Sequence, residues 1–126
     1  MNLTMEAASG AHLVRRYGDG EILVGDTRLV AACIVSPRRL IANVRPQRPA
    51  DLLREDLDAV FELAPEVVIV GWAGGQPYLP LRQRAWFLER RIGLEAMELG
   101  AACRTYNVLA QDERNAVALL FPAREA

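Results

Sequence analysis

The stretch GAACRTYN concentrates side chains that could do chemistry. Cys103 is a potential nucleophile or redox thiol, and Arg104 offers a planar fork of five donors that fits a carboxylate or phosphate. Thr105, Tyr106 and Asn107 add hydroxyl and amide groups that both donate and accept hydrogen bonds. The set could therefore serve as a thiol site, an anion or partner surface, or a means of satisfying backbone groups at nearby strand ends.

The thiol site is the least supported of these interpretations. A helix that begins near Ala101 would place Cys103 in its first turn, where the helix dipole and Arg104 favour the thiolate. However, the only histidine, His12, is remote in sequence and could act as a base only through the fold. We expect Cys103 to be a packed thiol and Cys33 to lie in the core, and we assign no catalytic residue.

A second candidate is the loop GWAGG, residues 71–75, which follows an apolar strand and precedes a helix. Phosphate-binding loops occur at such junctions, because glycines let the backbone approach a ligand at a helix N-terminus. The loop does not match GxGxxG, and Pro77 and Pro80 remove two backbone donors. A structural turn is favoured, while a ligand or partner surface at Gly71, Gly74 and Gly75 stays open.

Bulk composition restricts the class of protein. The 126 residues fit one domain, 52% of them are hydrophobic, and the formal net charge of −1 provides no field for nucleic acid or an anionic membrane. Two cysteines and one histidine do not make a four-ligand zinc site, so we expect no metal and no cofactor. The longest apolar run is too short to span a bilayer and no secretory signal opens the chain, so we expect a cytoplasmic protein.

The periodicity predicts strands that alternate with helices. A hairpin is expected across Gly25 and Asp26, followed by helix–strand pairs. The helices are expected at 51–65, 81–93 and 100–114, and the strands at 66–71, 94–99 and 115–121. This order predicts an α/β three-layer sandwich with a mixed, largely parallel central sheet plus an N-terminal β-hairpin. The expected boundaries are a loose N-terminus (1–11), one domain (12–121) and a C-terminal tail (122–126).

Helical spacing also predicts which side chains face the core. In the first helix the expected buried residues are Leu53, Leu57, Val60, Phe61 and Ala64, and in the second they are Leu81, Ala85, Leu88 and Ile92. In the third helix Ala102, Tyr106 and Leu109 are expected to face inward. Trp72 is expected to be exposed at the tip of its loop.

Three segments resemble a widespread small domain of unknown function, found in archaea and proteobacteria. They are YGDGEILVGDTRLVAACIVSPRRLIANV, PEVVIVGWAGGQPYLP and IGLEAMELGAACRTYNVLAQDERNAVALL. The eukaryotic member of that family is mitochondrial respiratory complex I (NADH:ubiquinone oxidoreductase) assembly factor 3. The resemblance implies a three-layer α/β fold, no established catalysis, and a chaperone-like role in assembling a membrane-bound complex. Its motif positions in this chain are Gly71, Gly74, Pro80, Arg104, Thr105, Tyr106 and Asn107, whereas Trp72 and Ala73 depart from its usual GTG loop.

Two hypotheses for function follow. The first is a non-enzymatic interaction protein whose partner is an assembly factor or a membrane-complex subunit, with no nucleic acid bound, no transmembrane segment, and a homodimer left open. Such a protein would be cytoplasmic, or peripheral at the inner membrane through its partner. The second is a small-anion or metabolite binder, or a cryptic enzyme, that uses the 71–75 loop and the helix start at Arg104.

Overall fold

The computed structural model describes residues 10–123 of the chain. Its elements in order are β1 (Val14–Gly18), β2 (Glu21–Val24), β3 (Thr27–Leu29), β4 (Cys33–Val35), β5 (Leu40–Ile41), η2 (Pro49–Asp51), η3 (Arg54–Leu57), α1 (Asp58–Glu62), β6 (Val67–Trp72), α2 (Leu81–Leu88), β7 (Gly93–Glu98), α3 (Leu99–Gln111) and β8 (Ala116–Phe121). Most of the expected loose N-terminus (1–11) and of the expected tail (122–126) lies outside the described residues, so these boundaries stay predictions.

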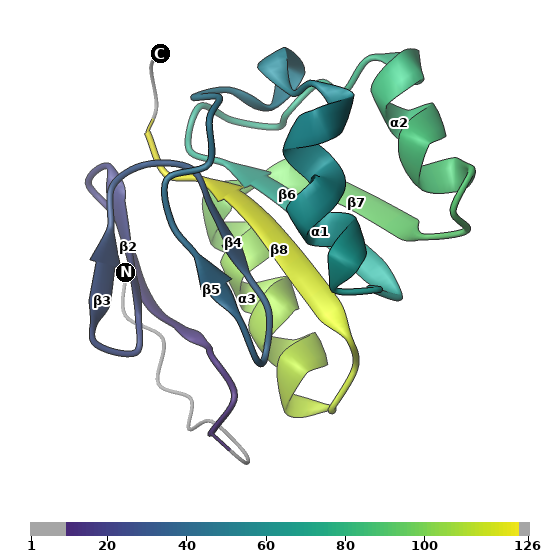
Figure 1. Cartoon of the computed structure of the whole chain (residues 1–126). Helices are drawn as coiled ribbons and strands as arrows, with labels where there is room; N and C mark the ends of the chain where they lie inside the picture. Colours follow the sequence, from purple (N-terminus) through teal and green to yellow (C-terminus); the bar gives the residue numbers. More distant parts are fainter. Residues whose placement is uncertain (1–9, 124–126) are drawn as a thin grey trace.

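A five-stranded mixed sheet forms the centre of the molecule, with the strand order β5-β4-β8-β6-β7. Strand β6 pairs in parallel with both β7 and β8, whereas β4 pairs antiparallel with β8 and with β5. The apolar, β-branched run of β6 suits this position, because a strand between two neighbours and under helices is covered on both faces. The sequence predicted a mixed, largely parallel central sheet, and the mixed sheet is confirmed, with its parallel pairs confined to β7, β6 and β8 (Figure 1).

The N-terminal strands form a separate antiparallel sheet in the order β1-β2-β3. The predicted hairpin across Gly25 and Asp26 joins β2 to β3, with Val24 opposite Thr27. The second strand of this hairpin was expected to run over residues 28–35, but it is interrupted. β3 ends at Leu29, and the chain then crosses into the central sheet as β4. One apolar run in the sequence therefore supplies strands to two different sheets.

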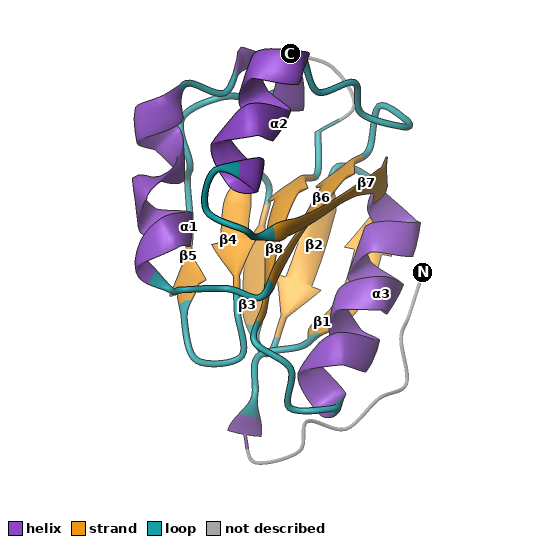
Figure 2. Ribbon diagram, turned by 90° about the vertical axis from the view of Figure 1, so that its right-hand side faces the viewer, coloured by secondary structure: helices purple, strands orange, loops and turns teal. Residues whose placement is uncertain are grey.

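Helices cover the two faces of the central sheet differently (Figure 2). On one face lies α3, together with the small β1-β2-β3 sheet, and they share a core around Ile69, Tyr106 and Leu120. On the other face lie η2, η3, α1 and α2, packed around Val68, Phe87 and further apolar residues. The predicted three-layer arrangement is confirmed, with the small sheet added to the α3 layer.

The first expected helix is much shorter than predicted. Residues 51–65 form short 3₁₀ turns followed by only five α-helical residues, Asp58–Glu62. Leu57 and Val60 are buried as expected, but Leu53 is 47% exposed and Leu52 is buried in its place. Leu53 is the extended N-cap residue of η3, and Asp56 accepts a hydrogen bond from its amide, so the helical turns begin only at Arg54 and the predicted spacing from Leu53 does not apply.

The predicted buried face of α2 is wrong. Leu81 and Leu88 are 73% and 78% exposed, and the residues that face the core are Gln83 and Phe87. Phe87 packs edge-on against Phe61, with ring centroids 5.5 Å apart. α2 thus packs inward through Phe87, the partly buried Trp86 and the Gln83 amide. Leu81 and Leu88 of the predicted apolar stripe lie on the solvent side.

The predicted loop tip at Trp72 is also wrong. Strand β6 continues through Trp72, which lies opposite Glu98 of β7 and Phe121 of β8. Its indole is half-buried and packs beside the core of the α1–α2 face. The ring also covers Gly74, where a Cβ atom would come within 2.3 Å of it.

Gly71→Ala is expected to destabilise the fold, because the added Cβ would lie 2.4 Å from the Ala102 Cβ and 3.0 Å from Leu120 Cδ2. Overpacking a filled core costs about 1–3 kcal/mol. Gly93→Ala is the control: its Cβ would meet nothing closer than 3.5 Å, so the change should stay within about 0.5 kcal/mol. Urea titration measures both, and equal losses would mean that α3 shifts easily away from β6.

Candidate functional site

The structure brings the end of β6 and the start of α3 to one edge of the sheet. β6 and β7 are parallel neighbours, and α3 begins directly after β7, so the two segments meet at the same edge. Gly71 lies directly against α3: a Cβ atom added at Gly71 would be 3.6 Å from the Cα of Leu99. The absence of a side chain at Gly71 is what allows this approach. The two candidate segments of the sequence are therefore neighbours in space.

The N-terminus of α3 is capped by a residue of its own chain. The carboxylate of Glu98 accepts hydrogen bonds from the amides of Gly100 and Ala101, at 3.0 and 2.6 Å. A carboxylate here satisfies backbone donors and complements the helix dipole. The helix begins at Leu99, so an external anion at this point would have to displace Glu98.

Arg104 is exposed and is directed to the small sheet. Its guanidinium donates a hydrogen bond to the Tyr17 hydroxyl at 2.6 Å. The Tyr17 ring lies against Gly100, where a Cβ would come within 2.7 Å of it. Arg104 thus links α3 to β1 at the helix surface.

Asn107 is fully buried and binds the backbone of β1. Its Oδ1 accepts from the Val14 amide and its Nδ2 donates to the Val14 carbonyl, both at 2.9 Å. Tyr106, also buried, donates its hydroxyl proton to the His12 carbonyl at 2.7 Å. These are the backbone-satisfying roles that the sequence left open for both residues.

The remaining candidate residues lie at the same edge with different exposure. Thr105 is half-buried, and its hydroxyl contacts the sulfur of Met97 at 3.5 Å. Gly74 is exposed under the Trp72 ring, and Gly75 has a φ of 129°, a backbone conformation that favours glycine. Of the predicted surface, Arg104 and Gly74 are the members that solvent reaches most.

Both cysteines are buried and held as thiols. Burial raises the pKa of Cys33 to about 12. Burial also raises the pKa of Cys103 to about 12, with nearby Cys33 and Glu98 adding to the increase and Arg104 opposing it. Cys103 lies in the second turn of α3 instead of the first, so the helix start does not compensate for its burial. The expectation of packed thiols is confirmed.

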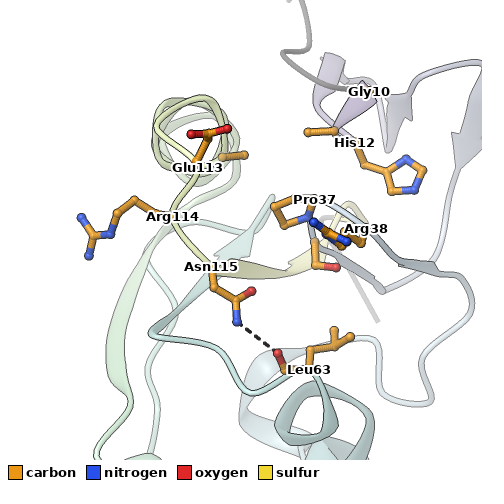
Figure 3. Close-up of a pocket in the computed structure, with 11 residues that line it drawn as sticks. Gly10, His12, Pro37, Arg38, Leu63, Glu113, Arg114 and Asn115 are labelled. Atoms are coloured by element: carbon orange, nitrogen blue, oxygen red, sulfur yellow. Dashed lines mark hydrogen bonds between the residues drawn. The ribbon is translucent and has the colours of Figure 1, made fainter.

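A hollow of about 780 Å³ lies at the opposite end of the sheet and is lined by none of the predicted site residues, although Tyr106 bonds the carbonyl of His12 in its wall. Its lining includes His12, Arg38 and Asn115. Figure 3 shows Asn115 bonded to the Leu63 carbonyl and the Arg114 guanidinium directed away from the hollow. Several of its polar groups are therefore already used by the fold, whereas Arg38, also in the lining, forms no ion pair within residues 10–123.

The described part of the chain comprises residues 10–123. Within them no group of three or more His, Cys, Asp or Glu side chains is placed to hold a metal ion. No helix in the same span is long and apolar enough to cross a membrane.

Sequence reasoning missed the residues that complete this edge. Glu98, Tyr17 and Val14 were not candidates. Glu98 binds the start of α3, Tyr17 binds Arg104, and the backbone of Val14 binds Asn107. The signal for Glu98 was present, because an acidic residue just before a helix is a common way to complement its dipole. Tyr17 and Val14 lie about 90 positions away from α3 in the chain, so no local pattern indicates them.

A family model for a protein of unknown function (DUF498/DUF598) matches residues 14–121. The chain belongs to this family. Three bacterial proteins, among others, have solved structures that share the fold of this chain. A crystal structure from Bordetella parapertussis is 38% identical, covers 91% of this chain and 98% of its own, and has a TM-score of 0.82.

The other two were solved by NMR. A protein from Xanthomonas campestris is 29% identical over 100% of this chain and 96% of its own, with a TM-score of 0.82. A protein from Bordetella pertussis, described as an Mth938-like domain, is 32% identical over 97% and 92%, with a TM-score of 0.79. No curated protein matches the chain. The DUF498/DUF598 assignment thus establishes family and fold.

Asn107→Ala is expected to cost about 2–4 kcal/mol of unfolding free energy, because two buried backbone groups of Val14 each lose their partner. Hydrogen exchange should report the cause directly, as faster exchange of the Val14 amide. The exposed neighbour Val108 serves as the control, and Val108→Ala should change stability by less than about 0.5 kcal/mol. Unchanged Val14 exchange in Asn107→Ala would contradict the role assigned to Asn107.

Native protein at neutral pH is expected to resist alkylation by iodoacetamide at both cysteines, and unfolded protein to react at both. Because each native pKa is raised to about 12, the unfolded chain loses its thiol protons first. This contribution to stability is complete below pH 9 and is lost as pH rises toward 12. In Cys103→Ala the melting temperature should therefore fall less steeply between pH 9 and pH 12 than in the wild type. Rapid labelling of native Cys103 would show instead that solvent reaches it.

Proposed function

We propose that this protein is a non-enzymatic interaction protein that assists the assembly of a membrane-bound complex. Respiratory complex I is the case indicated by the resemblance of its sequence to the assembly-factor-3 family. Its partner would be another assembly factor or a subunit of the complex. The protein would then act in the cytoplasm or at the inner membrane, held there through that partner.

The observation that carries the proposal is the exposed apolar surface at α2. Leu81 and Leu88 lie on its outward face, Tyr78 precedes the helix by three residues, and their exposed fractions are 73%, 78% and 75%. Large apolar side chains gathered on one solvent-facing element are typical of surfaces that bind other proteins. Figure 1 shows α2 at the margin of the molecule, where a partner can approach it.

The chemistry of the edge formed by β6 and α3 gives further support to an interaction role. The side chains that could act as catalysts there are engaged within the fold: Asn107 with Val14, Tyr106 with His12 and Glu98 with the start of α3. The thiol of Cys103 is protonated at neutral pH, because burial raises its pKa to about 12. The polar residues of this edge hold elements together, and the exposed apolar residues lie elsewhere.

The alternative, a small-anion or metabolite binder, is favoured by one observation. The hollow lined by His12, Arg38 and Asn115 has a volume of about 780 Å³, within the range of small-molecule sites. Under this alternative the ligand would lie at the opposite end of the sheet from the 71–75 loop and Arg104. Arg38 would supply the donor for its anionic group.

Deleting the gene from its host is expected to lower the amount of an assembled membrane complex, measured on native gels of solubilised membranes. The wild-type gene should restore the complex, and Leu81→Ser/Leu88→Ser should not. Val30→Ser is the matched control, since Val30 is also apolar and 59% exposed but lies outside α2.

Normal amounts of every membrane complex in the deletion strain would overturn the proposed function. A metabolite that raises the melting temperature of the wild type, but not of Arg38→Ala, would support the ligand-binding alternative instead. Thermal melts of Leu81→Ser/Leu88→Ser are needed as well. Substitution of two exposed side chains should leave the melting temperature nearly unchanged.

A further inference from the structure

The outward face of α2 has the layout of one half of a helix–helix interface. Successive helix residues are rotated by about 100°, so Leu81, Ala85 and Leu88 lie within a strip about 60° wide. These spacings of four and three residues are those of a packing seam between two helices. Ala85 lies between the two leucines and has only a methyl group, so a large side chain of a second helix could pack over it.

Positive charge flanks this seam on both sides. Helical rotation places Arg82 on one side of the strip and Arg84 on the other, and both are exposed. Neither forms an ion pair with another residue among positions 10–123. The acidic residue at the end of the helix, Glu89, is already paired with Arg54 at 3.2 Å. The surface is thus apolar along its centre and cationic along its edges.

Charge disfavours a second copy of the chain as the occupant. An antiparallel pair of α2 helices with a two-fold axis near Ala85 would place the two Arg84 side chains on the same flank of the interface. Each copy would add two cations and no available carboxylate from this helix. Like charges in such flanking positions destabilise a helix pair.

The shape disfavours a lipid surface. The helix has eight residues, about 12 Å of length, and offers a lipid only two outward leucines. Helices that lie in a membrane interface bury a much larger continuous apolar face. A short strip of Leu81, Ala85 and Leu88 is by contrast sufficient for contact with a single partner helix.

We propose that the outward face of α2, with Tyr78 at its N-terminal side, docks an acidic amphipathic helix of a partner protein. Leucine-sized side chains of that helix pack between Leu81 and Leu88 over Ala85. Glu or Asp residues beside them pair with Arg82 and Arg84, where a guanidinium accommodates a carboxylate in a bidentate manner. This inference rests on the proposed function for its biological setting and names the chemistry of the partner.

The test uses the purified full-length chain and two synthetic peptides of about five helical turns. Both carry a leucine stripe, flanked by Glu in one peptide and by Lys in the other. The Glu peptide is expected to bind at least about tenfold more tightly than the Lys peptide in a fluorescence anisotropy titration, and to lose affinity as salt rises. Arg82→Glu/Arg84→Glu should reverse this preference, and Leu81→Ala/Leu88→Ala should weaken binding of the Glu peptide by about tenfold or more.

Val108→Ala is the matched control, because Val108 is exposed on a different helix, and it should bind both peptides like the wild type. Equal affinity for the two peptides, or no binding of either, would overturn the inference. So would binding of phosphatidylglycerol vesicles without the Glu peptide, or self-association that the leucine substitutions abolish. The deletion experiment tests the proposed function independently. If the Glu peptide does not bind but the deletion strain loses a membrane complex, only this docking mode is rejected. If the Glu peptide binds but every membrane complex is present in normal amounts, only the assembly role is rejected.

Discussion

The close contact between α3 and β6 is the constraint on which the rest of the structure depends. Gly71 has no Cβ and Ala102 has only a methyl group, so the helix backbone can lie almost directly on the strand. A larger side chain at either position would lift α3 from the sheet. At this depth the hydroxyl of Tyr106 reaches the His12 carbonyl and the amide of Asn107 reaches Val14.

The same depth lets α3 act as a pairing partner for β1. Strand β1 is at the margin of its three-stranded sheet, with β2 on one side only. On the other side the amide of Asn107 makes the two hydrogen bonds to Val14 that a neighbouring strand would supply. Covering the edge in this way protects it from pairing with other chains. The polar residues of α3 that most resemble a reactive site therefore have a structural purpose.

The sequence allowed the layers, most of the strands and the buried face of α3 to be predicted, because each of these has a clear period or an uninterrupted apolar run. Ala102 and Tyr106 are buried as the spacing indicated. The partners of the candidate residues could not be predicted, because contacts such as Arg104 with Tyr17 join positions far apart in the chain. The orientation of α2 was not predictable either, since hydrophobicity indicated Leu81 as the residue to bury and gave no reason to bury Gln83.

The buried amide of Gln83 explains why α2 is turned in this way. Its Nε2 donates to the carbonyls of Ala50 and Leu52, which belong to an irregular segment with few backbone partners of its own. Unsatisfied carbonyls under a helix would cost more than two exposed leucines, because leucine on a surface is tolerated whereas a buried polar group without a partner is not. With Gln83 and Phe87 inward, helix geometry directs Leu81 and Leu88 outward. The need to satisfy one loop thus fixes an apolar stripe on the surface. The cost is that the Oε1 of Gln83 is itself left buried without a hydrogen-bond partner.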